Sequence, residues 1–194
     1  MGVSSLWGKK RTIQRDISMT RLKKAFWVWC EFSSSDIVYL NQIQNKVQRE
    51  LRGPEFKIHL TLAGPFNEIN PSSINGIRTY CSQNSPIQVK LFKYDYQEKF
   101  FQSFFIAVSQ SKELNDLRNA MFKINHQKPS HPYLPHVSLA YGDYEKTTKE
   151  NLITSLPRLK NSIAIDKVSI VDIDEDINLW KVSECFSFSS ASLV

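Results

Sequence analysis

The sequence has few of the residues that mark several common kinds of site. Its three cysteines are widely separated, and none forms a CxxC pair or a Cys/His cluster with zinc-ligand spacing. Its six glycines include no GxGxxG or GxxxxGK pattern, so nucleotide folds built on a glycine-rich phosphate loop lose their main support. No apolar run approaches the roughly 20 residues that a membrane-spanning helix requires. We therefore expect a cytoplasmic protein without a metal, a cofactor or a membrane partner.

Positive charge is concentrated at the N-terminus. The net charge is +6, and residues 1–24 carry seven lysines and arginines but a single acidic residue, Asp16. Two interpretations stay open, a solvated tail and an arm that binds nucleic acid. We treat residues 1–24 as a basic leader. Residues 25–194 are long enough to bury a core of their own, and we expect one bilobal domain that acts as a monomer.

Hydrophobic periodicity predicts two halves of similar order, each with a helix, a histidine-bearing strand, a second helix and two strands. Antiparallel pairs and short helices without regular βαβ alternation favour the α+β class. We expect two antiparallel sheets that flank a central cleft, with the helices outside. The predicted strands are 25–32, 56–63, 87–94, 103–108, 136–141, 162–173 and 179–188, and the predicted helices are 37–51, 71–81, 112–124 and 147–156.

The same short motif occurs once in each half. His59 is followed two residues later by Thr61, and His136 is followed two residues later by Ser138, with apolar residues between and after them. Because side chains alternate across a strand, each motif presents an imidazole and a hydroxyl on one face. A single such motif is commonly structural. Two copies in matching strands indicate a site.

Two histidines can move both protons of a phosphodiester hydrolysis. A neutral imidazole can accept a proton from water, and a protonated imidazole can donate one to the leaving oxygen, because the unperturbed pKa of about 6.5 populates both forms. Thr61 and Ser138 would hydrogen-bond the non-bridging oxygens. The sequence does not distinguish the acid from the base.

The paired motifs resemble the two-histidine phosphoesterases, and among these the plant and fungal cyclic phosphodiesterases. The resemblance covers about 25–188, with supporting features at 53–56, 100–102, 132–135 and Trp180. It implies a metal-independent site formed by the four motif residues. It also implies substrate contacts from a further set of residues, Phe101, Gln102, Tyr133 and Tyr141.

Two implications of the resemblance depend on local geometry. Tyr141 is three residues after Ser138, so strict alternation places it on the other face, and a bulge or the end of the strand is needed to bring it round. A disulfide like that of the family would join Cys81 and Cys185, although the spacing from Trp180 to Cys185 is one residue short.

The expected reaction is metal-independent opening of a cyclic phosphodiester. The substrate would be a 2′,3′-cyclic nucleotide, giving a 2′-phosphomonoester, or ADP-ribose 1″,2″-cyclic phosphate, giving ADP-ribose 1″-phosphate. One alternative keeps the histidine pair and acts on RNA, at 2′-5′ linkages or RNA ends. Another is a non-catalytic nucleotide-binding module, but a binder has no need of two proton-transfer groups.

Overall fold

The computed structural model describes residues 24–189, so nearly all of the predicted basic leader lies outside the described residues. No helix within this range is long and apolar enough to span a membrane. The predicted α+β class is confirmed. The strands are β1 (Ala25–Phe32), β2 (Leu60–Phe66), β3 (Ile87–Asp95), β4 (Phe104–Val108), β5 (His136–Ala140), β6 (Ser162–Ile173) and β7 (Lys181–Ser187). The helices are α1 (Ser34–Leu51), α2 (Pro71–Gln83), α3 (Lys112–Ile124) and α4 (Lys146–Ser155), with short 3₁₀ turns η1 (Phe100–Gln102) and η2 (Ile177–Leu179).

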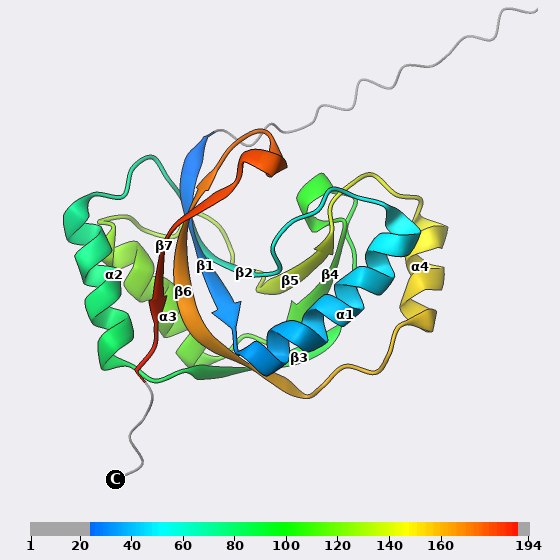
Figure 1. Ribbon diagram of the computed structural model, residues 1–194, viewed down its shortest axis with the longest axis horizontal. Helices are drawn as coiled ribbons and strands as arrows, with labels where there is room; N and C mark the ends of the chain where they lie inside the picture. Colours follow the sequence, from blue (N-terminus) through cyan, green and yellow to red (C-terminus); the bar gives the residue numbers. More distant parts are fainter. Residues whose placement is uncertain (1–23, 190–194) are drawn as a thin grey trace, which may run out of the picture.

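All paired strands are antiparallel and follow the order β1-β2-β5-β4-β3-β6-β7, with a further pairing between β1 and β6. The long strand β6 therefore pairs with strands of both predicted halves. Its first residues pair with β3, and its later residues pair with β1 and β7. The two expected sheets are thus joined through one strand. Helices α2 and α3 lie at one end of the molecule, and α1 and α4 lie at the other (Figure 1).

Helices α1 and α3 begin where the sequence supplies a serine cap. The side chain of Ser33 accepts a hydrogen bond from the backbone of Asp36 at the start of α1, and Ser111 does the same for Leu114 at the start of α3. In α3, buried residues recur at helical spacing, including Leu117 and Met121. These faces cover the sheet.

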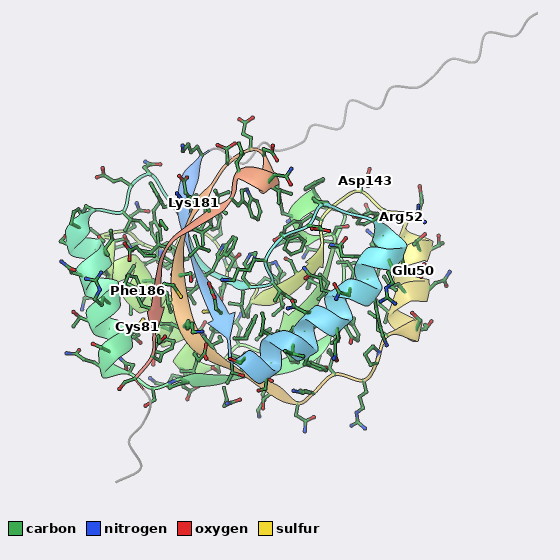
Figure 2. The ribbon with its side chains drawn as sticks, in the orientation of Figure 1. Glu50, Arg52, Cys81, Asp143, Lys181 and Phe186 are labelled. Carbon is green, nitrogen blue, oxygen red and sulfur yellow. The ribbon has the colours of Figure 1, made fainter. Side chains whose placement is uncertain are left out.

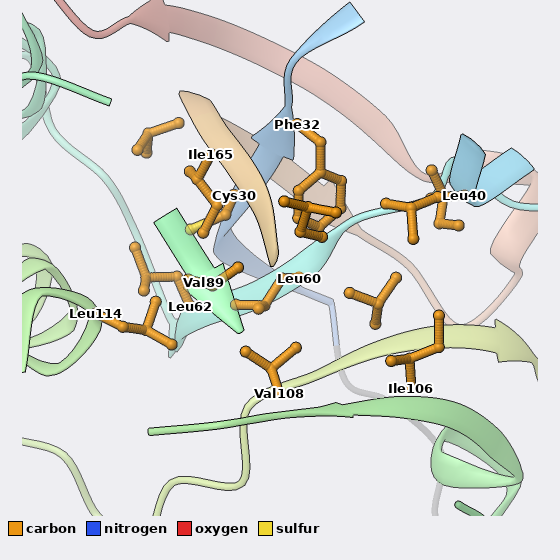
Figure 3. Packing of buried hydrophobic residues seen from close by; sticks show 14 of the residues in the cluster. Cys30, Phe32, Leu40, Leu60, Leu62, Val89, Ile106, Val108, Leu114 and Ile165 are labelled. Carbon is orange, nitrogen blue, oxygen red and sulfur yellow. The ribbon is translucent and has the colours of Figure 1, made fainter. Parts of the chain in front are cut away.

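The core lies behind the strands that carry the motifs. The apolar residues between and after the motif positions, Leu60, Leu62, Val137 and Leu139, are at most 1% exposed. Figure 3 shows Leu60 and Leu62 among side chains from several strands and from α3, including Leu114. The motif side chains therefore lie on the opposite face of the strands, directly above this packed core.

The predicted strand 56–63 is wrong in its start, because β2 begins at Leu60. The preceding residues run toward α1 instead of pairing with a strand. Gln44 of α1 donates to the Phe56 carbonyl, and Gln48 donates to the Pro54 carbonyl. Side chains of the helix thus take the acceptors that a strand partner would need.

Cys81 and Cys185 are both free thiols in the structure. Cys81 lies on α2, at the opposite end of the molecule from Glu50 and Arg52 at the end of α1 (Figure 2). Burial raises the pKa of the Cys81 thiol to about 12. The disulfide implied by the resemblance is absent between these two residues.

Candidate active site

His59 directly precedes β2 and Thr61 lies on it, whereas His136 and Ser138 lie on β5. Strands β2 and β5 pair antiparallel at the apolar residues between the motif positions. Continuing this register places His59 opposite Ser138 and Thr61 opposite His136. The two histidines are then diagonal neighbours, with Cα atoms about 7–8 Å apart. The structure therefore brings the four predicted side chains together.

Both imidazoles are held in the same way by the main chain. The Nδ1 atom of His59 lies 2.7 Å from the carbonyl oxygen of Lys57, and Nδ1 of His136 lies 2.8 Å from that of Leu134. Because a carbonyl only accepts, Nδ1 must carry the hydrogen in both rings. In the neutral rings, Nε2 then has the lone pair and is the atom available for proton transfer.

The two histidines differ in how far they are buried. His59 is 3% exposed, whereas His136 is half-buried. Burial lowers the pKa of His59 from 6.5 to about 4; the hydrogen bond to the Lys57 carbonyl opposes this change, and the charge of His136 adds to it. Burial also lowers the pKa of His136, against its hydrogen bond to the Leu134 carbonyl. Each histidine is biased toward its neutral form without a ligand.

Aromatic rings are clustered around His59. The indole of Trp29 stacks on His59, with ring centroids 3.5 Å apart and an angle of 7° between the planes. Trp180, just after η2, contacts Trp29 and also reaches Tyr141, with centroid distances of 5.8 and 5.9 Å. Phe56 stacks on Tyr141 at 4.0 Å. Aromatic side chains from both halves of the chain therefore line the site around His59.

Two of the predicted substrate contacts lie within this aromatic group. Tyr141 directly follows the last residue of β5 and is 3% exposed. Burial raises the pKa of its phenol and the Ser138 side chain opposes this change, so the end of the strand brings Tyr141 to the site. Phe101, on η1, contacts Tyr141 at 5.3 Å and Trp180 at 6.1 Å.

The other two predicted contacts have mainly structural partners. The backbone carbonyl of Gln102 accepts from the backbone of Gln97, and its side chain is half-buried. The hydroxyl of Tyr133 donates to the backbone carbonyl of Thr61 at 3.2 Å, and the Arg118 guanidinium lies over its ring at 4.6 Å. Tyr133 thus supports the strand that carries the first motif.

The loop before β2 packs closely against the end of β5. A Cβ atom on Gly53 would lie 2.5 Å from the Tyr141 carbonyl oxygen and would also meet the Tyr144 hydroxyl. Glycine is required here by this close approach, not by an unusual backbone angle. This contact holds the loop that precedes the first motif against the end of β5, the strand that carries the second motif.

A cavity of about 320 Å³ is lined by Trp29 and Phe56, the two aromatic residues that contact the His59 ring, although His59 itself is not part of its lining. Lys57, Glu55 and Asn178 supply polar groups to its lining. The cavity is of the size typical of sites for small organic ligands. Within residues 24–189, no three His, Cys, Asp or Glu side chains are grouped as metal ligands.

Trp29 was not predicted as a site residue, and Phe56 and Trp180 were named only as supporting features of the resemblance. The sequence of β1 nevertheless contains a signal. Glu31 occurs two residues after Trp29, so a charged residue shares the face of the tryptophan. A face that holds a carboxylate is not simple core.

Comparison with known proteins agrees with this architecture. E. coli LigT, in a structure with 3′-AMP, has a TM-score of 0.55 and 10% identity, over 87% of this chain and 100% of that one. The protein TT0787 of Thermus thermophilus has a TM-score of 0.58 and 16% identity, over 86% and 99%. No curated protein sequence matched the chain. The model of the 2′-5′ RNA ligase superfamily matches residues 33–177. The chain therefore belongs to this superfamily and is a two-histidine phosphoesterase, as its paired motifs predict.

Proposed function

We propose that the protein hydrolyses a cyclic phosphodiester of a ribose, with His59 and His136 transferring the protons. The observation that carries the proposal is the arrangement of two imidazoles and two hydroxyls on one face of β2 and β5, with both Nε2 atoms available. A phosphate group between them would meet a proton acceptor, a proton donor and two hydrogen-bond donors.

In the proposed reaction, the oxygen of a water molecule attacks phosphorus while His59 Nε2 accepts one of its protons. The bond from phosphorus to one ribose oxygen breaks, and His136 Nε2 donates a proton to that oxygen. For a 2′,3′-cyclic nucleotide, release of the 3′ oxygen leaves a 2′-phosphomonoester. Thr61 and Ser138 donate to the non-bridging oxygens, where negative charge increases in the transition state.

The environments of the two histidines favour this division of roles. A base must begin neutral, and His59 is the more deeply buried histidine, with its pKa near 4. As His59 becomes positively charged, the π face of Trp29 stabilises the cation. His136 is more open, and the negative charge of a bound phosphodiester would raise its pKa and so favour the protonated form that an acid needs.

The cavity beside His59 and the aromatic group offer a place for the nucleoside part of the substrate. A base can stack on Phe101, which is half-buried, and Tyr141, Gln102 and Tyr133 remain additional predicted contacts. E. coli LigT binds 3′-AMP, ATP and NADP⁺ in its structures. These ligands support a nucleotide, including ADP-ribose 1″,2″-cyclic phosphate, as the substrate class.

RNA with 2′-5′ linkages is a second candidate substrate, favoured by the name of the superfamily whose model matches the chain. The same two histidines would act on a linear phosphodiester. The difference lies in the leaving group, which would be a nucleoside oxygen of the next residue instead of an oxygen of the same ribose.

A product-resolved assay tests the proposal. Purified protein with EDTA is incubated with 2′,3′-cyclic nucleotides, ADP-ribose 1″,2″-cyclic phosphate and 2′-5′ oligonucleotides. We expect cyclic substrates to be opened, and His59→Ala and His136→Ala to lower kcat by at least about a thousandfold. His131→Ala is the matched control, because His131 is exposed.

Three other results would contradict the proposal or favour one of its alternatives. Full activity in either single motif variant contradicts the histidine mechanism. Turnover of the 2′-5′ oligonucleotides but of none of the cyclic substrates supports RNA as the substrate. Nucleotide binding without turnover of any substrate supports a non-catalytic binding module.

A further inference from the structure

The two motif histidines have different neighbours along the sheet. Continuing the register between β1 and β2 places Glu31 opposite His59, whereas the register between β4 and β5 places Ala107 opposite His136. One imidazole therefore has a carboxylate on the adjacent strand, and the other has a methyl group. The motif is repeated in the sequence, but the residues opposite the two histidines on the adjacent strands differ.

The carboxylate of Glu31 is buried and firmly held. Glu31 is 8% exposed, Lys57 Nζ lies 2.7 Å from its Oε1 atom, and the Ser169 hydroxyl donates to the same oxygen. Burial acts to raise the pKa of Glu31, but the bonds from Lys57 and Ser169 and the charges of Lys57 and Lys167 outweigh it and hold the pKa below its ordinary value. Glu31 is therefore ionised at neutral pH.

Lys57 connects this carboxylate to His59. Its side chain forms the ion pair with Glu31, and its backbone carbonyl accepts the Nδ1 hydrogen of His59 at 2.7 Å. Two residues of the same loop, Pro54 and Phe56, have their carbonyls held by side chains of α1. At Lys57 the side-chain anchor is Glu31.

The second motif has an equivalent backbone carbonyl, but the residue that supplies it has no side-chain ion pair. Leu134 accepts the Nδ1 hydrogen of His136, and its apolar side chain is 45% exposed. An apolar side chain cannot form an ion pair, so the Leu134 carbonyl lacks the side-chain anchor that Lys57 has.

We propose that Glu31 is a positioning residue for His59, acting through its ion pair with Lys57, which fixes the carbonyl that orients the imidazole. The inference rests on the proposed hydrolysis for its effect on rate, but the orientation of the ring is a property of the unliganded protein. A base whose Nε2 atom is displaced by about 1 Å can lose about a hundredfold in rate.

Two conservative variants test the proposal from both sides of the ion pair. Glu31→Gln keeps the length of the side chain and its capacity to accept from Ser169, and Lys57→Met keeps the backbone carbonyl. Asp95→Asn is the matched control, because Asp95 also forms an ion pair on a strand of this sheet, with Lys93 at 2.9 Å, and is on β3, away from the two motif strands.

We expect Glu31→Gln and Lys57→Met each to lower kcat about ten- to a hundredfold. In Glu31→Gln, KM should change less than about threefold, whereas Lys57 also lines the cavity proposed for the nucleoside, so KM of Lys57→Met should rise as well. The double variant should lose little more than either single variant, because both remove the same ion pair. Asp95→Asn should retain the wild-type kcat.

Imidazole ¹H–¹⁵N correlation spectra supply a readout that does not depend on turnover. In both variants the Nδ1 signals of His59 should shift or broaden while those of His136 stay unchanged. Thermal unfolding identifies a variant that fails to fold; Lys57 is exposed, so Lys57→Met keeps the test available if Glu31→Gln unfolds.

Wild-type kcat together with unchanged His59 signals in Lys57→Met would overturn the positioning role. Failure of the proposed function looks different. If His59→Ala keeps full turnover but the His59 signals respond to Glu31→Gln, then the mechanism is wrong and the positioning of the ring stands.

Discussion

The imidazole of His59 lies flat against the indole of Trp29, with ring centroids 3.5 Å apart. This contact excludes water from one face of the histidine. The face of an indole is negative, so it favours a cation over a neutral ring. The same contact therefore helps to bury the neutral base and stabilises the charge that the base acquires.

Replacing Trp29 should slow the reaction more than it weakens binding. We expect Trp29→Leu to lower kcat about tenfold, because a cation–π contact of about 1–2 kcal/mol is lost. Trp29→Phe keeps an aromatic face and should lose less. Steady-state kinetics on a cyclic substrate measure both variants. Equal kcat for Leu and Phe at this position would show that the ring face contributes nothing.

The dependence of kcat/KM on pH should be bell-shaped, with its optimum below neutrality. Activity rises with pH through the pKa of His59, about 4, because the base must be neutral. It falls with pH through the pKa of His136, which lies below 6.5, because the acid must be protonated. The kcat profile should lie at higher pH, since bound phosphate raises both pKa values. An optimum of kcat/KM above about pH 7.5 would contradict this assignment.

The motif hydroxyls should contribute to the chemical step. Thr61→Val and Ser138→Ala each remove one donor to the non-bridging oxygens, and we expect each to lower kcat about a hundredfold. Single-turnover rates check the effect on chemistry, and thermal unfolding checks that the fold is intact. The idea fails if both variants react at the wild-type rate.

The packed core beneath the motif residues should be important for stability. Leu60 is fully buried between the motif residues, so Leu60→Ala should lower the free energy of unfolding by about 2–5 kcal/mol. Val38→Ala is the control, because Val38 is 57% exposed and should change it by less than about 0.5 kcal/mol. Urea denaturation measures both. Similar values for the two variants would refute the packing argument.

Elements with strong local signals were predictable from the sequence. The bounds of β1, β6 and α3 agree with the predicted ones, because strand alternation, helical spacing and the Ser111 cap act within a few residues. The four motif side chains could also be placed on one face, since alternation alone determines that face.

The remaining features depend on contacts between distant parts of the chain. The start of β2 is set by glutamines of α1, and Tyr141 reaches the site only because β5 ends at Ala140. The stacking of Trp29 on His59 requires the register of two strands. No local pattern encodes these contacts. The sequence therefore predicted the motif residues and, through the resemblance, Phe101 and Tyr141, but not the packing of Trp29 and Phe56 against His59.

The sharing of β6 has a consequence for how the molecule is assembled. Strand β1 near the N-terminus pairs along its length with β6, which ends at Ile173, and β3 pairs with the start of the same strand. A nascent chain that has emerged only as far as β5 already contains both motifs, but β1 and β3 each lack a neighbour. Such long-range pairing slows folding. The active site should therefore close only late in synthesis, and the two halves should not fold as separate polypeptides.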